Sequence, residues 1–211
     1  MKVTKYEHAA LLIEKDGHRL VIDPGTFLAS MGSPTDVVTV VITHEHGDHW
    51  TAERLDQLIA ANPGIRILAP QGVADAAVGY PVEVVHGGDR VTIEPFDLRF
   101  FGEKHAQIHS SMPPVDNVGV LVDDALYYGG DSYTLPGVPV DTLAVPIGAP
   151  WLKIGEAIDY ALAVAPKRAF PTHDGTLSQP GKEIGGAHMK RLLATIGADY
   201  VVLEPGDSLE L

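Results

Sequence analysis

One segment restricts this chain more than any other: Thr43–His49 places three imidazoles and two carboxylates within seven positions. It directly follows Val37–Ile42, a run in which every residue is β-branched and almost all are apolar. Such a run predicts a strand that is buried on both faces. In α/β folds, ligand-binding residues gather just beyond the carboxyl ends of strands. The segment is therefore typical of a metal site rather than of a solvated histidine cluster in a surface loop.

The spacing inside this segment suits metal coordination. Residues two apart on an extended chain point to the same side, so His44 and His46 can grip one ion while Glu45 points away. The following glycine permits a sharp turn, after which Asp48 and His49 face back from the start of the next helix. Neutral imidazoles and carboxylates are natural zinc ligands. One short segment with four of them can serve two adjacent ions.

The rest of the chain combines short apolar runs with a few helical patterns. The expected strands are Ala9–Glu14, His18–Asp23, Val37–Ile42, Ile65–Ala69, Val82–Val85, Arg90–Glu94, Leu98–Phe101, Val118–Val122, Ala125–Tyr128, Thr142–Ile147, Arg168–Pro171, Tyr200–Leu203 and Ser208–Leu211. The expected helices are Thr51–Ala61 with Thr51 as its N-cap, Gln71–Val78, Ile154–Ala165 and Gly185–Ile196. Grouped strands with helices after some of them indicate a mixed α/β fold. No linker divides the chain, so residues 1–211 are expected to form a single domain.

Composition removes several classes of protein. The chain has 211 residues, of which 45% are hydrophobic, and no cysteine, which argues against a disordered protein, a disulfide framework and a thiolate metal site. Its formal net charge of −13 argues against broad binding to nucleic acid or to anionic membranes. No signal peptide or membrane-length apolar run is seen, so a cytoplasmic protein without membrane or nucleic-acid partners is expected. The oligomeric state is left open.

The pattern His-x-His-x-Asp-His resembles the metallo-β-lactamase superfamily. The likeness is greatest to its small stand-alone zinc-dependent hydrolases and lactonase-like members. Shorter segments add weaker support, namely Tyr6–Ala9, Gly130–Ser132 and Pro146–Gly148. The resemblance implies a four-layer αβ/βα sandwich with one or two metal ions at the edge of the sheets.

The resemblance also implies ligands further along the chain, and a suitable residue follows each of three apolar strands. The implied first group is His44, His46 and His105; the second group is Asp48, His49 and His173; the bridging residue is Asp131. Two divalent ions are therefore expected. Zinc is the first expectation, and manganese or iron would accept the same ligands.

Three residues near this pattern have two interpretations each. His109 is the alternative to His105 as a ligand; His105 is favoured because it lies nearer the strand exit, which leaves His109 beside the site or facing substrate. Asp23 either hydrogen-bonds a ligating histidine or is a plain turn residue. His8 lies at a strand junction that could approach the site, and a structural role is expected for it.

The substrate side of the site is less defined. Tyr133, Trp151 and Lys153 are candidates to border the cleft, because an aromatic wall and a cation suit a substrate with an anionic group. The alternative, in which Trp151 covers the core and Lys153 is solvated, fits equally well. The segment Gln107–Asn117 is expected to form a rim loop.

The expected reaction is metal-assisted hydrolysis of a small ester, lactone, amide, thioester or phosphodiester. Two cations would supply a shared hydroxide near neutral pH and stabilise the charge that develops on attack. Asp48 would orient the water and accept a proton. Three alternatives stay open: a nucleic-acid phosphodiesterase or nuclease, a metal-binding protein without catalysis, and a redox protein with two irons.

Overall fold

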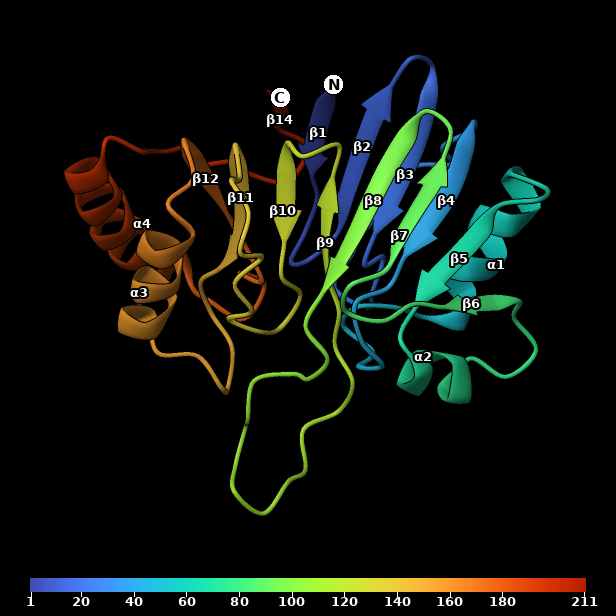
Figure 1. Cartoon of the computed structure of the whole chain (residues 1–211), viewed down its shortest axis with the longest axis horizontal. Coiled ribbons are helices and arrows are strands. Elements are labelled where there is room, and N and C mark those ends of the chain that lie inside the picture. Colours follow the sequence, from blue (N-terminus) through green and yellow to red (C-terminus); the bar gives the residue numbers. More distant parts are fainter.

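Two seven-stranded β-sheets pack face to face in the computed structural model, which describes residues 1–211 (Figure 1). The strands of the first sheet are, in spatial order, β14 (Ser208–Glu210), β1 (Lys2–Lys5), β2 (Leu11–Lys15), β3 (His18–Ile22), β4 (Val37–Val41), β5 (Arg66–Ala69) and β6 (Val82–Val84). The strands of the second sheet are β13 (Asp199–Tyr200), β12 (Arg168–Thr172), β11 (Thr142–Pro146), β10 (Leu126–Tyr128), β9 (Gly119–Val122), β8 (Phe96–Phe101) and β7 (Arg90–Ile93). Both sheets mix antiparallel and parallel pairs, as the grouping of strands along the sequence predicts.

Helices cover the outer face of each sheet. The helices are α1 (Ala52–Ala61) and α2 (Gln71–Ala76) on the first sheet, and α3 (Ile154–Val164) and α4 (Gln179–Leu193), with a 3₁₀ turn at Ala194–Ile196, on the second (Figure 1). Buried apolar side chains form one cluster between the sheets and one beneath each helical layer. The expected four-layer αβ/βα sandwich is therefore confirmed. None of these helices has both the length and the hydropathy that crossing a lipid bilayer requires.

Strand direction determines where a site can form. In the first sheet β1 and β3 are each antiparallel to β2, and β4 is parallel to β3, so β1, β3 and β4 point the same way. In the second sheet β8, β10, β11 and β12 likewise share one direction. The loops beyond these strands meet, because the amide of His173 donates to the carbonyl of His8 at 2.8 Å. The carboxyl ends of both sheets therefore open onto one shared edge.

One strand of the sandwich departs from the sequence pattern. The strand β1, Lys2–Lys5, is not expected from its composition, because Val3 is its one apolar residue. The side chain of Lys5 is nevertheless fully buried, since it forms an ion pair with Asp174 in the second half of the molecule. A long-range partner of this kind leaves no local signal in the sequence.

Two helices begin at side-chain caps. Thr51 Oγ1 accepts the amide of Arg54 at 3.1 Å, which confirms Thr51 as the N-cap of α1. Helix α4 begins at Gln179, well before the predicted start at Gly185. Ser178 caps this helix and a proline occupies its first turn, whereas the apolar spacing appears only further along. The prediction missed the cap because it followed the apolar spacing alone.

A long loop between β8 and β9 extends beyond the sheets, at the bottom of Figure 1. An isolated bridge between Lys104 and Asp116 closes its base, and Lys104 Nζ donates to the Asp116 carboxylate at 2.6 Å. The loop contains Gln107–Asn117, the segment expected to form a rim.

Candidate metal centre

Every expected ligand lies in a loop beyond the carboxyl end of a strand. His44, His46, Asp48 and His49 follow β4, His105 follows β8, Asp131 follows β10 and His173 follows β12. Their ligand atoms gather in overlapping groups, within each of which the atoms lie within 4.8 Å of one another. The fold thus brings together all the residues that the resemblance implies, from both sheets.

The first group consists of His44, His46 and His105. His44 Nε2 lies 3.1 Å from His46 Nδ1, and the rings of His44 and His105 meet edge to face at 4.9 Å between centroids. His44 and His105 are buried, whereas His46 is partly exposed. Three imidazoles that converge in this way form a typical zinc-binding set.

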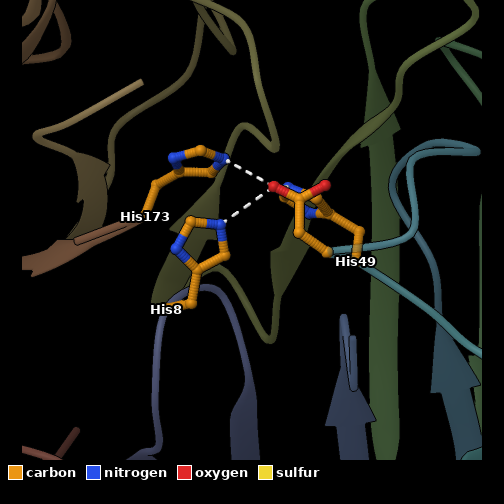
Figure 2. A group of neighbouring side chains, drawn as sticks. His8, His49 and His173 are labelled. Atoms are coloured by element: carbon orange, nitrogen blue, oxygen red, sulfur yellow. Dashed lines mark hydrogen bonds and ion pairs between the residues drawn. The ribbon is translucent and has the colours of Figure 1, made fainter. Parts of the chain in front are cut away.

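The second group consists of Asp48, His49 and His173, joined by His8. Asp48 Oδ2 lies 3.5 Å from His173 Nε2 and 3.8 Å from His49 Nε2. Figure 2 shows His8 and His173 directed toward the same carboxylate oxygen beside His49. The side chain of Asp48 is 27% exposed, whereas the histidines of this group are buried.

Asp131 lies between the two groups. Its Oδ1 is 3.3 Å from His49 Nε2, and its Oδ2 is 3.4 Å from His105 Nε2 and 3.0 Å from His173 Nε2. It therefore contacts nitrogen atoms of both groups, which is the position that a bridging carboxylate requires.

Several atoms of the centre are buried without a hydrogen-bond partner. They are His49 Nε2, His105 Nε2, His173 Nε2 and Asp131 Oδ1. A buried polar atom that lacks a partner costs free energy, so such atoms call for a specific explanation. Divalent cations held by the two groups would satisfy these atoms, and the residues present therefore fit metal ions.

In three histidines of the centre, the Nδ1 nitrogen forms a hydrogen bond with the surrounding protein. His105 Nδ1 and His173 Nδ1 bond to the carbonyls of Ala106 (2.5 Å) and Gly148 (2.6 Å), and each carbonyl requires the ring nitrogen to donate. His49 Nδ1 donates to Asp23 Oδ2 at 2.7 Å. A neutral imidazole that donates through Nδ1 keeps its lone pair on Nε2. These three tautomers therefore present the atoms that bind metal toward the centre.

Asp23 supports the β4 loop as well as His49. Its Oδ1 accepts the amide of Thr43 at 2.8 Å, and its Oδ2 accepts the Thr43 hydroxyl at 2.7 Å. The same hydroxyl is 3.0 Å from His44 Nδ1 and accepts from it, because its own hydrogen goes to Asp23. Asp23 is fully buried. Of the two roles expected for Asp23, the structure shows the hydrogen bond to a histidine of the centre.

In the centre, burial and neighbouring charges shift the pKa values of the ligands in opposite directions. Burial alone would raise the pKa of Asp131, but the imidazoles of His49 and His173 hold it well below its usual value. Burial would lower the pKa of His173, yet Asp131 and Asp48 raise it to about 10. The pKa of His49 is also raised, by Asp131 and Asp23 against burial. In the metal-free protein the imidazole of His173 is therefore protonated at neutral pH and balances the carboxylates, and it must lose its Nε2 proton before that atom can bind metal.

The residues expected to border the cleft differ in how close they lie to the centre. Trp151 Nε1 donates to Asp131 Oδ2 at 2.9 Å, and the ring of Tyr133 packs on Trp151 at 5.3 Å. Lys153 is 81% exposed and pairs with Glu156 one turn along α3, which matches the solvated alternative for this residue. Its position before the first turn of the helix directs the side chain to solvent.

His109 also lies away from both groups. It is exposed, and its Nδ1 bonds to the Ser111 hydroxyl at 2.8 Å. His105 instead joins the first group, because it stands at the base of the long loop while His109 lies toward its tip. The choice of His105 over His109 as a ligand therefore agrees with the geometry, while a role for His109 toward substrate stays a prediction.

His8 is the residue of the centre that sequence reasoning missed. It is 1% exposed, and its Nε2 lies 3.0 Å from Asp48 Oδ2. Its segment, Tyr6–Ala9, formed part of the family resemblance and was expected to be able to approach the site, but no contact with a ligand was assigned to His8. The expected structural role was therefore incomplete.

Close backbone packing holds the β4 loop in place. A Cβ on Gly25 would lie 1.8 Å from the backbone oxygen of Asp48, so only glycine fits there. The left-handed backbone of Asp23 (φ 47°) turns the chain into this contact. The segment Asp23–Gly25 is therefore shaped to the ligand loop.

The chain matches a known family along most of its length. A sequence model of the Beta-lactamase superfamily domain matches residues 2–173, from β1 to the last of the expected ligands. The chain belongs to the β-lactamase superfamily. Among similar proteins, Protein Rv0786c of Mycobacterium tuberculosis is 38% identical to it over 208 residues, which cover 96% of each chain.

Other similar proteins carry hydrolase names. The UPF0173 metal-dependent hydrolase MK1542 of Methanopyrus kandleri is 28% identical, with all of both chains covered. Among solved structures, Igni18, a metallo hydrolase of Ignicoccus hospitalis, has a TM-score of 0.76 and 20% identity, covering 100% of this chain and 98% of that one. At this identity Igni18 shows the shared superfamily fold alone.

Proposed function

We propose that this member of the β-lactamase superfamily is a metal-dependent hydrolase that holds two divalent ions. His44, His46 and His105 would bind one ion, and Asp48, His49 and His173 the other, with Asp131 shared between them. The observation that carries the proposal is the set of buried atoms without partners, namely three Nε2 atoms and one carboxylate oxygen. The hydrolase names of similar proteins support the reaction class.

Divalent ions at such a centre supply Lewis acidity and lower the pKa of a bound water toward neutrality. The chain's own residues do the remaining work. Asp131 is fixed by the indole of Trp151, and His49 is fixed by Asp23. Asp48 is the most exposed carboxylate of the centre, and its Oδ1 takes no hydrogen bond from the protein. Asp48 can therefore orient a water and accept its proton through that oxygen.

The substrate is proposed to be a small ester, lactone, amide or phosphodiester, and zinc the ion. The centre reaches solvent through His46 and Asp48, because its other ligands are buried. A small pocket beside His46 and His105 is lined by Ile108, Met112 and Val115 of the long loop. Its lining includes no Lys or Arg, which favours a small substrate with an apolar group over a polyanion.

A substrate screen with matched variants tests this proposal. Zinc-loaded protein is assayed on nitrophenyl esters, lactones and bis(nitrophenyl) phosphate, together with Asp131→Asn and, as a control, Glu83→Gln on the exposed edge strand β6. We expect turnover of at least one class by the parent and the control, and its loss in Asp131→Asn. Equal turnover by all three proteins would contradict the proposed centre. Turnover of DNA or RNA that falls steeply with salt would instead favour a nuclease.

A further inference from the structure

His8 is held in an uncommon position between the two halves of the molecule. It lies in the turn between β1 and β2 with a left-handed backbone (φ 61°), and it is almost fully buried. Its carbonyl accepts the amide of His173 at 2.8 Å, and its ring lies 3.9 Å from the ring of His173. Residues other than glycine adopt this backbone only where the surroundings impose it. The strained backbone of His8 is therefore stabilised by its contacts with the surrounding structure.

The hydrogen bonds of His8 determine its tautomer. The amide of Gly175 donates to His8 Nδ1 at 3.1 Å, so this nitrogen carries no hydrogen. A neutral imidazole with an accepting Nδ1 has its hydrogen on Nε2. His8 Nε2 lies 3.0 Å from Asp48 Oδ2 and therefore donates to it, along one of the dashed lines of Figure 2.

This tautomer separates His8 from the other histidines of its group. His8 lies close enough to Asp48, His49 and His173 to be counted as a fourth ligand. A metal ligand needs a lone pair on the nitrogen that faces the ion, and His49 and His173 present one on Nε2. The lone pair of His8 is on Nδ1 and is already used by the amide of Gly175.

The segment that carries Gly175 is itself fixed to β1. Lys5, at the end of β1, is completely buried and pairs with Asp174 at 3.1 Å. A Cβ on Gly175 would lie 2.9 Å from His8 Nδ1, so the two segments are in tight contact. His8 therefore keeps its orientation relative to His173 through both its backbone and its ring.

We propose that His8 is a positioning residue that binds no ion and instead holds Asp48 in place for the second ion by donating from Nε2 to Oδ2. The inference rests on the proposed two-ion function. Hydrogen-bond partners of ligating carboxylates typically contribute about 10- to 100-fold to metal affinity. His8 ties the one exposed carboxylate of the centre to the buried end of β1.

Two substitutions separate the two hydrogen bonds of His8. His8→Asn keeps an acceptor where Nδ1 stands, tolerates the left-handed backbone and loses the donor to Asp48. His8→Gln keeps an amide donor that can reach Asp48 and loses the acceptor for Gly175. In zinc titrations we expect His8→Asn to bind the first ion as the parent does and the second about 10- to 100-fold more weakly. His8→Gln is expected to restore much of the second affinity, and His18→Asn, on the exposed β2–β3 hairpin, to match the parent.

A second measurement uses the parent protein alone, so it does not depend on whether a variant folds. Two-bond ¹H–¹⁵N spectra of the zinc-loaded parent report which nitrogen of each histidine carries hydrogen. We expect His8 to show hydrogen on Nε2 and none on Nδ1. Hydrogen on Nδ1 with Nε2 bound to zinc would overturn the inference, as would unchanged second-ion affinity in His8→Asn. A parent that binds no zinc would overturn the proposed function itself and the inference with it.

Discussion

Asp131 is held in position by a residue that binds no ion. Trp151 Nε1 donates to Asp131 Oδ2, the oxygen that also faces His105 and His173. The indole is buried and packs against Tyr133. At the scale of single residues, the centre therefore depends on how each ligand is oriented as well as on which ligands are present.

Replacing the indole tests this support. Trp151→Phe keeps an aromatic ring and removes the donor to Asp131, so we expect zinc affinity to fall by about 10- to 100-fold. Tyr133→Phe is the matched control, because the Tyr133 hydroxyl makes no hydrogen bond and its ring is retained. Competition with a chromophoric chelator measures both affinities. If both variants bound zinc as tightly as the parent, the indole would have no role in positioning Asp131.

Zinc binding is expected to release a proton from His173. The pKa of His173 is raised to about 10, so its imidazole is protonated near pH 7 before an ion binds. A ligating imidazole must be neutral, so binding releases about one proton from this residue, and affinity falls as the pH falls. Calorimetric titration at pH 7 in buffers of different ionisation enthalpy counts the protons released. A count of zero would show that His173 was not a protonated ligand.

At the scale of elements, β1 and the loop after β12 form a joint between the two sheets. Lys5 is completely buried and pairs with Asp174, which also contacts Lys182 at 3.1 Å. Two hydrogen bonds from the same loop reach His8, from the amides of His173 and Gly175. This joint keeps the second ligand group assembled from both halves of the molecule.

Removing the carboxylate from this joint should be costly. Asp174→Ala leaves Lys5 buried without its partner, and we expect a loss of about 3–5 kcal/mol in the free energy of unfolding. Glu156→Ala removes the partner of Lys153, which is 81% exposed, and should cost about 1 kcal/mol or less. Urea denaturation in the presence of a chelator measures both without a contribution from bound metal. A loss for Asp174→Ala no larger than that of the control would rule out a structural role for the buried pair.

The elements also explain what the sequence could and could not predict. The β-branched, mostly apolar residues of Val37–Ile42 predict a buried strand, and the ligand segment after it has a spacing that few other sites share. By contrast, β1 and the role of His8 depend on contacts with Asp174 and Gly175, more than 160 positions away in the chain. Local patterns carry no trace of such partners. The sequence left two roles open for Lys153, because its place after a strand does not show that the side chain at the start of α3 extends into solvent.

At the scale of the whole molecule, the centre closes the shared edge of the sandwich. The first sheet supplies His8 and the β4 loop, and the second sheet supplies His105, Asp131 and His173. An ion bound there would link the two halves. Its affinity would then contribute directly to the stability of the folded chain.

Removing the metal is therefore expected to lower the melting temperature. An ion present at a thousand times its dissociation constant stabilises the native state by about 4 kcal/mol. For a domain of this size that corresponds to a shift of about 10 °C. Calorimetry of the zinc-loaded and the chelator-treated protein measures the difference, and Asp131→Asn should show a smaller one. Identical melting temperatures with and without zinc would contradict binding at the joint between the sheets.

The most direct test of the two-ion centre is the metal content of the protein. We expect protein purified without chelators, or reconstituted with zinc and freed of excess ion, to contain two ions per chain by elemental mass spectrometry. The same measurement on Asp131→Asn should find fewer, because the shared carboxylate faces both ligand groups. Two ions in the parent together with a loss in the variant would support the account. A parent chain that holds no transition metal would contradict it.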